Sequence, residues 1–316
     1  MFSVSEVHNE FDCIVLKDEI SGTQAVIVPS CGAILQHFSI QKNGKTFNVI
    51  DSYQSEEDFK NNCTSRGFKG TKLSPFVCRL ENGNYNFASE LYHIEKFYLG
   101  KNAIHGLIYD APFSVVEKNA GEDFARVILK LEYGGFDPGY PFRYECRITY
   151  QLQENNSLSV STTITNLDEG LIPIADGWHP YFTLGKKLDE LQFEFQSKEI
   201  MEFDEQLIPT GKLFPYEEFG SLNKLGAQSF DNCFTLNFAE CQPLCVLRNA
   251  EEGVQVEIIP SRSYPYLQIY TPDHRNSIAI ENLSAAPDAF NNAIGINIIE
   301  PGHSSTFKTT YKISRI

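Results

Sequence analysis

Short runs in which apolar and polar residues alternate dominate the chain from about residue 124 onward. FARVILKLEY (124–133), YECRITYQLQ (144–153) and VQVEII (254–259) are rich in β-branched and aromatic residues and repeat with a period of two. Successive side chains of a strand point to opposite faces, so this period is typical of strands that bury one face. Polar segments separate the runs, at residues 154–156 and 248–253 for example, and predict the turns of antiparallel hairpins.

Helical patterns are few and brief. No amphipathic segment exceeds two turns, and the best candidates lie around residues 55–62 and 288–291. Parallel strands need crossovers of a dozen or more residues, which are usually helical, so a βαβ fold is excluded. The pattern therefore predicts an all-β fold, a large antiparallel β-sandwich. Because no linker, charge block or fixed-period repeat divides the chain, we expect a single domain over residues 1–316.

The composition agrees with sheets and limits the partners. The 316 residues include 24 Phe and 15 Tyr but only 2 Met, a balance that suits pleated sheets. The net charge of −15 argues against a nucleic-acid partner, because phosphate backbones are bound by clustered Lys and Arg. No segment approaches the ~20 apolar residues that span a bilayer, so no membrane partner is expected. The oligomeric state stays open.

The N-terminus and the cysteines indicate a cytoplasmic protein. The first residues, MFSVSEVHNEFDC, carry acidic side chains where a signal peptide would be basic and then apolar. Eight cysteines are scattered without the paired spacing of a zinc site or the density of a disulfide scaffold. We expect them to be reduced and mostly buried, and we predict no metal.

Three potential proton carriers stand in distinctive contexts. His179 lies in GWHPYF (177–182), His105 in NAIHGL (102–107), and Glu281 near the head of IENLSAAPDAFNN (280–292). Each alone could be a hydrogen-bonded structural residue, but together they indicate acid/base chemistry on a neutral polar ligand. His179 follows Trp178 directly, so the two side chains should face opposite sides of their strand. If His179 faces the ligand, Trp178 belongs to the core.

The order of the motifs resembles the aldose 1-epimerases, also called galactose mutarotases, over roughly residues 74–292. The motifs that carry the resemblance are NGNY (82–85), NAIHGL, FDPGYPF (136–142), GWHPYF with the following TLG, FDNCF (230–234) and IENLSAAPDAFN. The resemblance implies a β-supersandwich and the interconversion of the α and β anomers of a free sugar. It implies that Glu281 acts as general base and His179 as general acid. It also implies that His105, which completes the catalytic set, binds the sugar together with Arg79 and Asp231.

The chemistry of ring opening fits these residue types. A cyclic hemiacetal opens when the C1 hydroxyl loses a proton and the ring oxygen gains one, so a base and an acid must flank one small ligand. A carboxylate and an imidazole meet that need near neutral pH, and each contributes about 10²- to 10⁴-fold. Only protons move, so no organic cofactor or metal is required.

Several alternatives stay open at this point. Where the family often has Asn-Arg-Ile the chain has Cys78, Arg79 and Leu80, and Leu283 stands where a Gln is common, so the preferred sugar is undecided. A hexose-6-phosphate 1-epimerase would need an anion site, and a non-catalytic carbohydrate-binding sandwich would need no matched acid and base. Arg79 could instead close a structural ion pair, Asp231 could begin a turn, and Glu281 could cap backbone donors.

Overall fold

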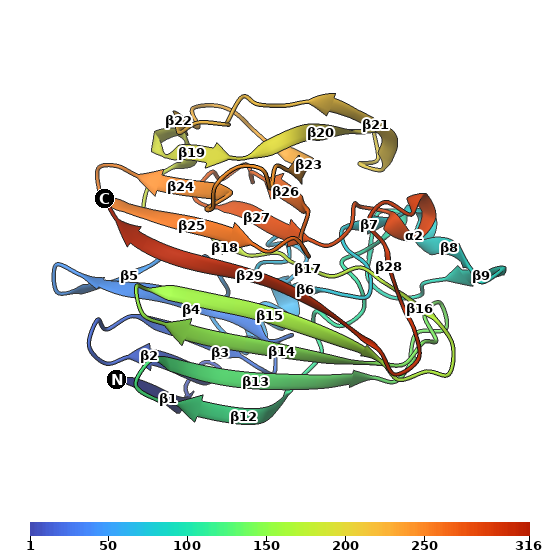
Figure 1. Ribbon diagram of the computed structural model, residues 1–316, viewed down its shortest axis with the longest axis horizontal. Coiled ribbons are helices and arrows are strands. Elements are labelled where there is room, and N and C mark those ends of the chain that lie inside the picture. The colour runs from blue at the N-terminus through green and yellow to red at the C-terminus, as the bar shows by residue number, and fades with distance from the viewer.

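The computed structural model describes residues 1–316 and is built almost wholly from antiparallel strands (Figure 1). A nine-stranded sheet forms one layer, and it shares a core of 62 buried residues with a five-stranded and an eight-stranded sheet. The prediction of an all-β antiparallel sandwich is confirmed. The single domain over residues 1–316 stays a prediction.

The nine-stranded sheet is the most regular part of the molecule. β13 and β14 pair over ten residues, as do β14 and β15. Burial alternates along β14 and along the first six residues of β13, as the sequence pattern predicts. In spatial order its strands are β12 (Ser114–Ala120), β13 (Phe124–Tyr133), β14 (Tyr144–Gln153), β15 (Ser157–Asn166), β29 (Ser304–Arg315), β25 (Val254–Pro260), β24 (Cys245–Asn249), β19 (Gln192–Phe195) and β22 (Asn223–Lys224).

Both predicted hairpin turns are present in this sheet. Residues 154–156 join β14 to β15, and Asn155 and Asn156 adopt φ of 59° and 54°. Asparagine tolerates this left-handed region better than most residues, which explains its use in the turn. In the predicted turn 248–253, the first two residues still belong to β24, and residues 250–253 link β24 to β25 and end in Gly253 with φ of 63°.

The five-stranded sheet comes from the N-terminus, a region where the sequence pattern did not predict strands. It is a simple meander in which each strand pairs with the next along the chain. Its strands are β1 (Phe2–His8), β2 (Asp12–Asp18), β3 (Gln24–Val28), β4 (Ile34–Lys42) and β5 (Lys45–Asn48).

Three strands of the eight-stranded sheet, β6, β17 and β18, have only two residues each. Its order combines segments far apart in the chain, and β18 pairs with β27 beside the main path. The strands are β21 (Pro209–Pro215), β20 (Ser197–Phe203), β23 (Asp231–Leu236), β26 (Tyr266–Tyr270), β27 (Ile278–Leu283), β17 (Gly177–Trp178), β6 (Lys72–Leu73) and β18 (Tyr181–Phe182).

Small sheets and short helices complete the fold, and α2 and strands β7, β8, β9, β16 and β28 lie on the right-hand side of Figure 1. The small sheets are β10 (Tyr98–Leu99) with β11 (Asn102–Ile104) and β7 (Arg79–Leu80), β16 (Ile172–Ile174) with β28 (Asn297–Ile299), and β8 (Asn84–Phe87) with β9 (Glu90–His93). The helices are α1 (Glu56–Asn62) and α2 (Ala289–Asn292), with 3₁₀ turns at Glu81–Gly83 and Leu188–Glu190.

Both helices lie where the sequence predicts brief helices. Ser55 caps α1 by accepting a hydrogen bond from the Asp58 backbone N–H at 3.0 Å, and Asp288 immediately precedes α2. Neither helix is long and apolar enough to cross a membrane.

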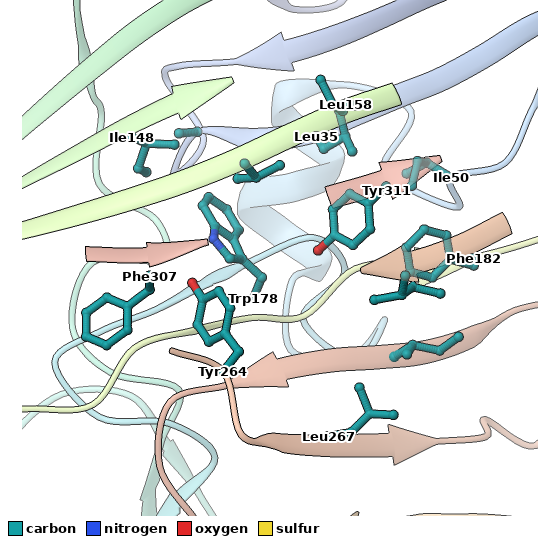
Figure 2. Packing of buried hydrophobic residues seen from close by; sticks show 14 of the residues in the cluster. Leu35, Ile50, Ile148, Leu158, Trp178, Phe182, Tyr264, Leu267, Phe307 and Tyr311 are labelled. Carbon is teal, nitrogen blue, oxygen red and sulfur yellow. The ribbon is translucent and has the colours of Figure 1, made fainter. Parts of the chain in front are cut away.

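One face of the eight-stranded sheet packs against the core, and the other face points away from it. Figure 2 shows Trp178 packed inside the sandwich among Tyr264, Phe307 and Tyr311. Fully burying a large apolar side chain contributes about 1.5–3 kcal/mol, so this layer anchors the short strand β17. His179, the next residue, lies on the opposite side, as the alternation predicts.

Candidate active site

A cavity of about 540 Å³ opens on the face of the eight-stranded sheet that points away from the core. Its lining includes all five residues selected from the sequence, namely Arg79, His105, His179, Asp231 and Glu281. These residues come from five separate segments, so only the folded chain brings them together.

Glu281 reaches the cavity from the middle of the sheet. On β27 the side chain of Ile280 belongs to the core, so that of Glu281 points to the other face, where it is 2% exposed. Burial raises the pKa of the carboxyl well above its usual range, and the negative charge of Asp231 adds to this effect while Arg79 opposes it. The carboxylate of Glu281 is therefore a strong base once it is ionised.

The backbone of His179 is held by two hydrogen bonds, one through its N–H and one through its carbonyl. Its N–H donates to the Thr71 carbonyl at 3.0 Å, and its carbonyl accepts from the Gly70 N–H at 2.8 Å. The Tyr181 ring stacks on the imidazole with centroids 5.3 Å apart. Burial lowers the pKa of His179 to about 4, so its protonated form is a strong acid.

The two groups touch. His179 Nε2 lies 3.2 Å from Glu281 Oε1, while Nδ1 of His179 and Oε2 of Glu281 are buried without hydrogen-bond partners. Glu281 therefore caps no backbone donor, which removes that alternative. Because burial raises the pKa of Glu281 and lowers that of His179, a proton shared by the pair rests on the carboxyl, and the charged pair lies above this neutral state in free energy. Oε2 of Glu281 is open to a further donor.

His105 stands beside His179 in a strained conformation. Its φ is 61°, followed by 78° at Gly106, and its N–H donates to the Cys78 carbonyl at 2.9 Å. A non-glycine residue in this region is uncommon and costs energy, and such residues cluster at functional sites. The ring meets that of His179 edge to face at 5.0 Å. Burial lowers the pKa of His105 well below its usual value, and His179 and Arg79 lower it further.

Arg79 is placed by the PDAFN segment. Its strand β7 pairs with β11, so that Arg79 lies opposite Ile104, and its carbonyl accepts a hydrogen bond from the Asp288 N–H at 2.8 Å. The Asp288 carboxylate in turn accepts from the Glu81 N–H at 2.9 Å. Asp288 of the PDAFN segment thus holds the segment that carries Arg79. Arg79 lines the cavity.

Asp231 begins β23 rather than a turn, and it has a partner that the sequence analysis missed. Gln268 Nε2 donates to Asp231 Oδ1 at 2.9 Å, and Gln268 lies opposite Glu281 in the β26–β27 register. The Gln268 Oε1 is buried without a partner. Burial raises the pKa of Asp231, against the lowering effects of Arg79 and of this hydrogen bond. A ligand in the cavity would therefore meet donors and acceptors on neighbouring strands.

The remaining cations of the lining are already paired. Arg66 Nη1 lies 2.9 Å from an Asp58 carboxylate oxygen, and Lys69 Nζ lies 2.7 Å from one of Asp51. These carboxylates offset the positive charge that an anionic ligand would need. No group of three or more His, Cys, Asp or Glu side chains has the arrangement of a metal site.

Comparison with known proteins agrees with the geometry. The model of the aldose 1-epimerase family matches residues 12–312. The uncharacterised protein YihR of Escherichia coli is 26% identical over 241 residues, which cover 74% of this chain and 75% of that protein. The maltose epimerase of Levilactobacillus brevis is 22% identical over 322 residues, 93% of this chain and 92% of that enzyme.

Solved structures show the same fold at low identity. A galactose mutarotase-like protein from Clostridium acetobutylicum superposes with a TM-score of 0.86 at 18% identity, covering 100% of this chain and 99% of that one. The galactose 1-epimerase of Lactobacillus acidophilus gives a TM-score of 0.79 at 18% identity, with 100% and 98% covered. With the family match extending over nearly the whole sequence, the chain belongs to the aldose 1-epimerase family.

Proposed function

We propose that this protein interconverts the α and β anomers of a free aldohexose, with Glu281 as general base and His179 as general acid. The observation that carries the proposal is the 3.2 Å contact between a buried imidazole and a buried carboxyl in the cavity. Their pKa values are shifted in the directions that strengthen each group for its role.

Ring opening uses the pair as protonated His179 and ionised Glu281. Glu281 removes the proton of the C1 hydroxyl, the electron pair left on that oxygen forms the C1 carbonyl, and the C1–O5 bond breaks. The ring oxygen takes the proton from His179. The pair is then neutral on both partners, the state that burial favours.

Ring closure reverses the proton transfers. After rotation about C1–C2, His179 takes the proton of the O5 hydroxyl as O5 attacks the other face of the aldehyde, and Glu281 protonates the C1 oxygen. The opposite anomer leaves, and the pair returns to its starting charges. Neither step consumes a cofactor.

We assign sugar binding to Arg79, Asp231, His105 and Gln268. A guanidinium can donate two parallel hydrogen bonds to adjacent hydroxyls, and a carboxylate accepts from a hydroxyl pair. These contacts would hold C1 and O5 against the acid and the base together. Because Arg66 and Lys69 are already paired with carboxylates, a neutral sugar suits the lining better than a hexose 6-phosphate.

The cysteines favour the cytoplasm as the place of action. All eight are free and seven are buried. Burial raises the pKa of the Cys233 and Cys146 thiols, which makes them poor nucleophiles.

Polarimetry tests the proposal directly. Freshly dissolved α-D-glucose, α-D-galactose and maltose should each be followed with wild-type protein, with H179N and without protein. At least one neutral sugar should equilibrate faster with the wild type than with the variant. Binding without acceleration would favour the non-catalytic carbohydrate-binding module, and faster turnover of a 6-phosphate in an anomer-specific assay would favour the phosphosugar epimerase.

A further inference from the structure

A buried ion pair lies on the core side of the segment that ends in His179. Lys72 Nζ is 2.6 Å from Asp176 Oδ2, and both side chains are fully buried, at 0% exposure. Removing two charges from water offsets most of their attraction, so such pairs seldom add to stability, and a role in fixing geometry is the better explanation to test.

Lys72 contacts three consecutive residues directly before His179. Besides the Asp176 carboxylate, its ammonium donates to the Gly177 carbonyl at 3.0 Å and lies 4.7 Å from the centre of the Trp178 ring. The strand that carries Lys72 pairs with Gly177–Trp178 as well. The Lys72 side chain thus contacts each of the three residues that precede His179 in the chain.

Asp176 extends this connection to the strand of Glu281. Its backbone N–H donates to Ser284 Oγ at 2.8 Å, and its carbonyl accepts from the Ser284 N–H at 2.8 Å. Ser284 lies three residues after Glu281. The carboxylate of Asp176 also accepts from the Tyr264 hydroxyl at 2.7 Å, and Tyr264 packs in the core beside Trp178 (Figure 2).

We propose that Lys72 is a positioning residue that, through Asp176, sets His179 at hydrogen-bond distance from Glu281. It touches neither the cavity nor a ligand. The inference rests on the proposed function where it concerns turnover, but the placement of the imidazole can be measured without it.

Loss of this pair should affect kcat and leave KM nearly unchanged. The groups assigned to sugar binding are carried by β7 (Arg79), β23 (Asp231), β26 (Gln268) and the residue that follows β11 (His105). The Lys72 ammonium contacts Asp176, Gly177 and Trp178 and none of these four groups. A shift of the imidazole by about 1 Å can cost on the order of 100-fold in rate. We expect kcat to fall about 10- to 100-fold and KM to change less than about twofold.

The test uses K72M, K72M/D176N and the control L129A. Met keeps the length of the lysine, and Asn keeps an oxygen for Tyr264, so the double variant leaves no unpaired buried charge and should fold. Leu129 lies in the core on β13, so its truncation lowers Tm without touching the site. Both Lys72 variants should lose kcat by the factor above, whereas L129A should keep the wild-type kcat. Wild-type kcat in the double variant would overturn the proposal. If the double variant fails to fold while L129A folds, the pair serves the fold as a whole, which also overturns it.

Histidine NMR gives a readout that needs no activity. With the His179 signal assigned by its loss in H179N, the pKa of His179 should rise from about 4 toward its ordinary value in K72M/D176N and stay in place in L129A, because a displaced ring is less buried. An unchanged His179 pKa in the double variant overturns the positioning role whatever the kinetics show. If the wild type turns over no sugar, the proposed function fails, and this measurement decides the role of Lys72 by itself.

Discussion

The nine-stranded and the eight-stranded sheets of this sandwich differ in how they treat polar groups. In the nine-stranded sheet, long strands such as β13 and β14 alternate buried and partly exposed residues. In the eight-stranded sheet, β6, β17 and β18 have two residues each, and all six residues of β27 are buried, Glu281 and Asn282 included. Regular alternation is suited to stability, whereas buried polar side chains carry a cost in stability that a binding site can explain.

The position of unpaired polar atoms shows this difference, because those of the nine-stranded sheet, Arg126 Nε and Thr162 Oγ1, lie outside the cavity lining. His179 Nδ1, Gln268 Oε1 and Glu281 Oε2 are buried without hydrogen-bond partners, and all three residues line the cavity. Such atoms lower stability unless something pairs with them. The eight-stranded sheet is therefore preorganised for a polar ligand, at the expense of its own stability.

The largest expected effect comes from removing either proton carrier. E281Q and H179N should each lower kcat by at least about 100-fold, because each nearly preserves shape but cannot exchange the proton. Their circular dichroism should stay that of the wild type. Polarimetry or a coupled anomer assay measures the rates, and near wild-type turnover in either variant would remove that residue from the mechanism.

Truncation in the regular sheet should have the opposite effect. L129A leaves a cavity in the core and should lower the free energy of unfolding by about 2–5 kcal/mol. Because Leu129 is remote from the cavity lining, kcat at a temperature where the variant is folded should stay within about twofold of the wild type. Urea unfolding and polarimetry on the same sample measure both. A kcat loss as large as that of E281Q would show that the sheets are not separable in this way.

The same contrast explains what the sequence could predict. The strands of the nine-stranded sheet follow from their period of two, and GWHPYF separates Trp178 from His179 as alternation requires. The N-terminal sheet was not recognised. Its strands, such as β2 with burial on neighbouring as well as alternate residues, lack a clean period.

Gln268 and Lys72 could not be selected from the sequence for a physical reason. The run YLQIYT (266–271) predicts a strand in which Gln268 points to the opposite face from its two neighbours in the chain. Only the register of β26 with β27 places Gln268 beside Glu281. Lys72 belongs to a strand of two residues, too short to show a period. The PDAFN segment was noted as a motif, yet its contact with the Arg79 carbonyl depends on tertiary structure.

A smaller effect is expected from the residues assigned to holding the sugar. R79A and D231A should each raise KM about tenfold, with a lesser fall in kcat, because a loosely held ring no longer presents C1 and O5 together. Initial rates over a range of sugar concentrations measure this. Unchanged kinetics in both variants would assign Arg79 and Asp231 to structure. The functional part of the eight-stranded sheet would then be limited to Glu281 and His179.

The smallest expected effect is a difference in the pH dependence of stability between one carboxyl of each sheet. Burial raises the pKa of Glu281. For Glu257 on β25, burial acts in the same direction, but its hydrogen bond with Gln255 and the ion pair with Lys312 contribute to a net lowering of the pKa. The two side chains should therefore respond to pH with opposite signs.

The signs follow from the linkage between proton binding and folding. A raised pKa means that the native state loses stability as pH rises from the unfolded value, about 4.3, through the folded value. E281Q should therefore be more stable than the wild type at pH 8, with a gain that shrinks toward pH 4. A carboxyl whose pKa is lowered by folding stabilises the native state at pH values above its unfolded-state pKa, and this stabilisation is lost as pH falls through its folded-state pKa. E257Q should therefore be less stable than the wild type at pH 8, with a deficit that shrinks below pH 4. Urea midpoints at about pH 8, 6, 4 and 3 measure both differences. Shifts of the same sign in the two variants would contradict the view that one sheet buries its carboxyl for chemistry and the other pairs it for stability.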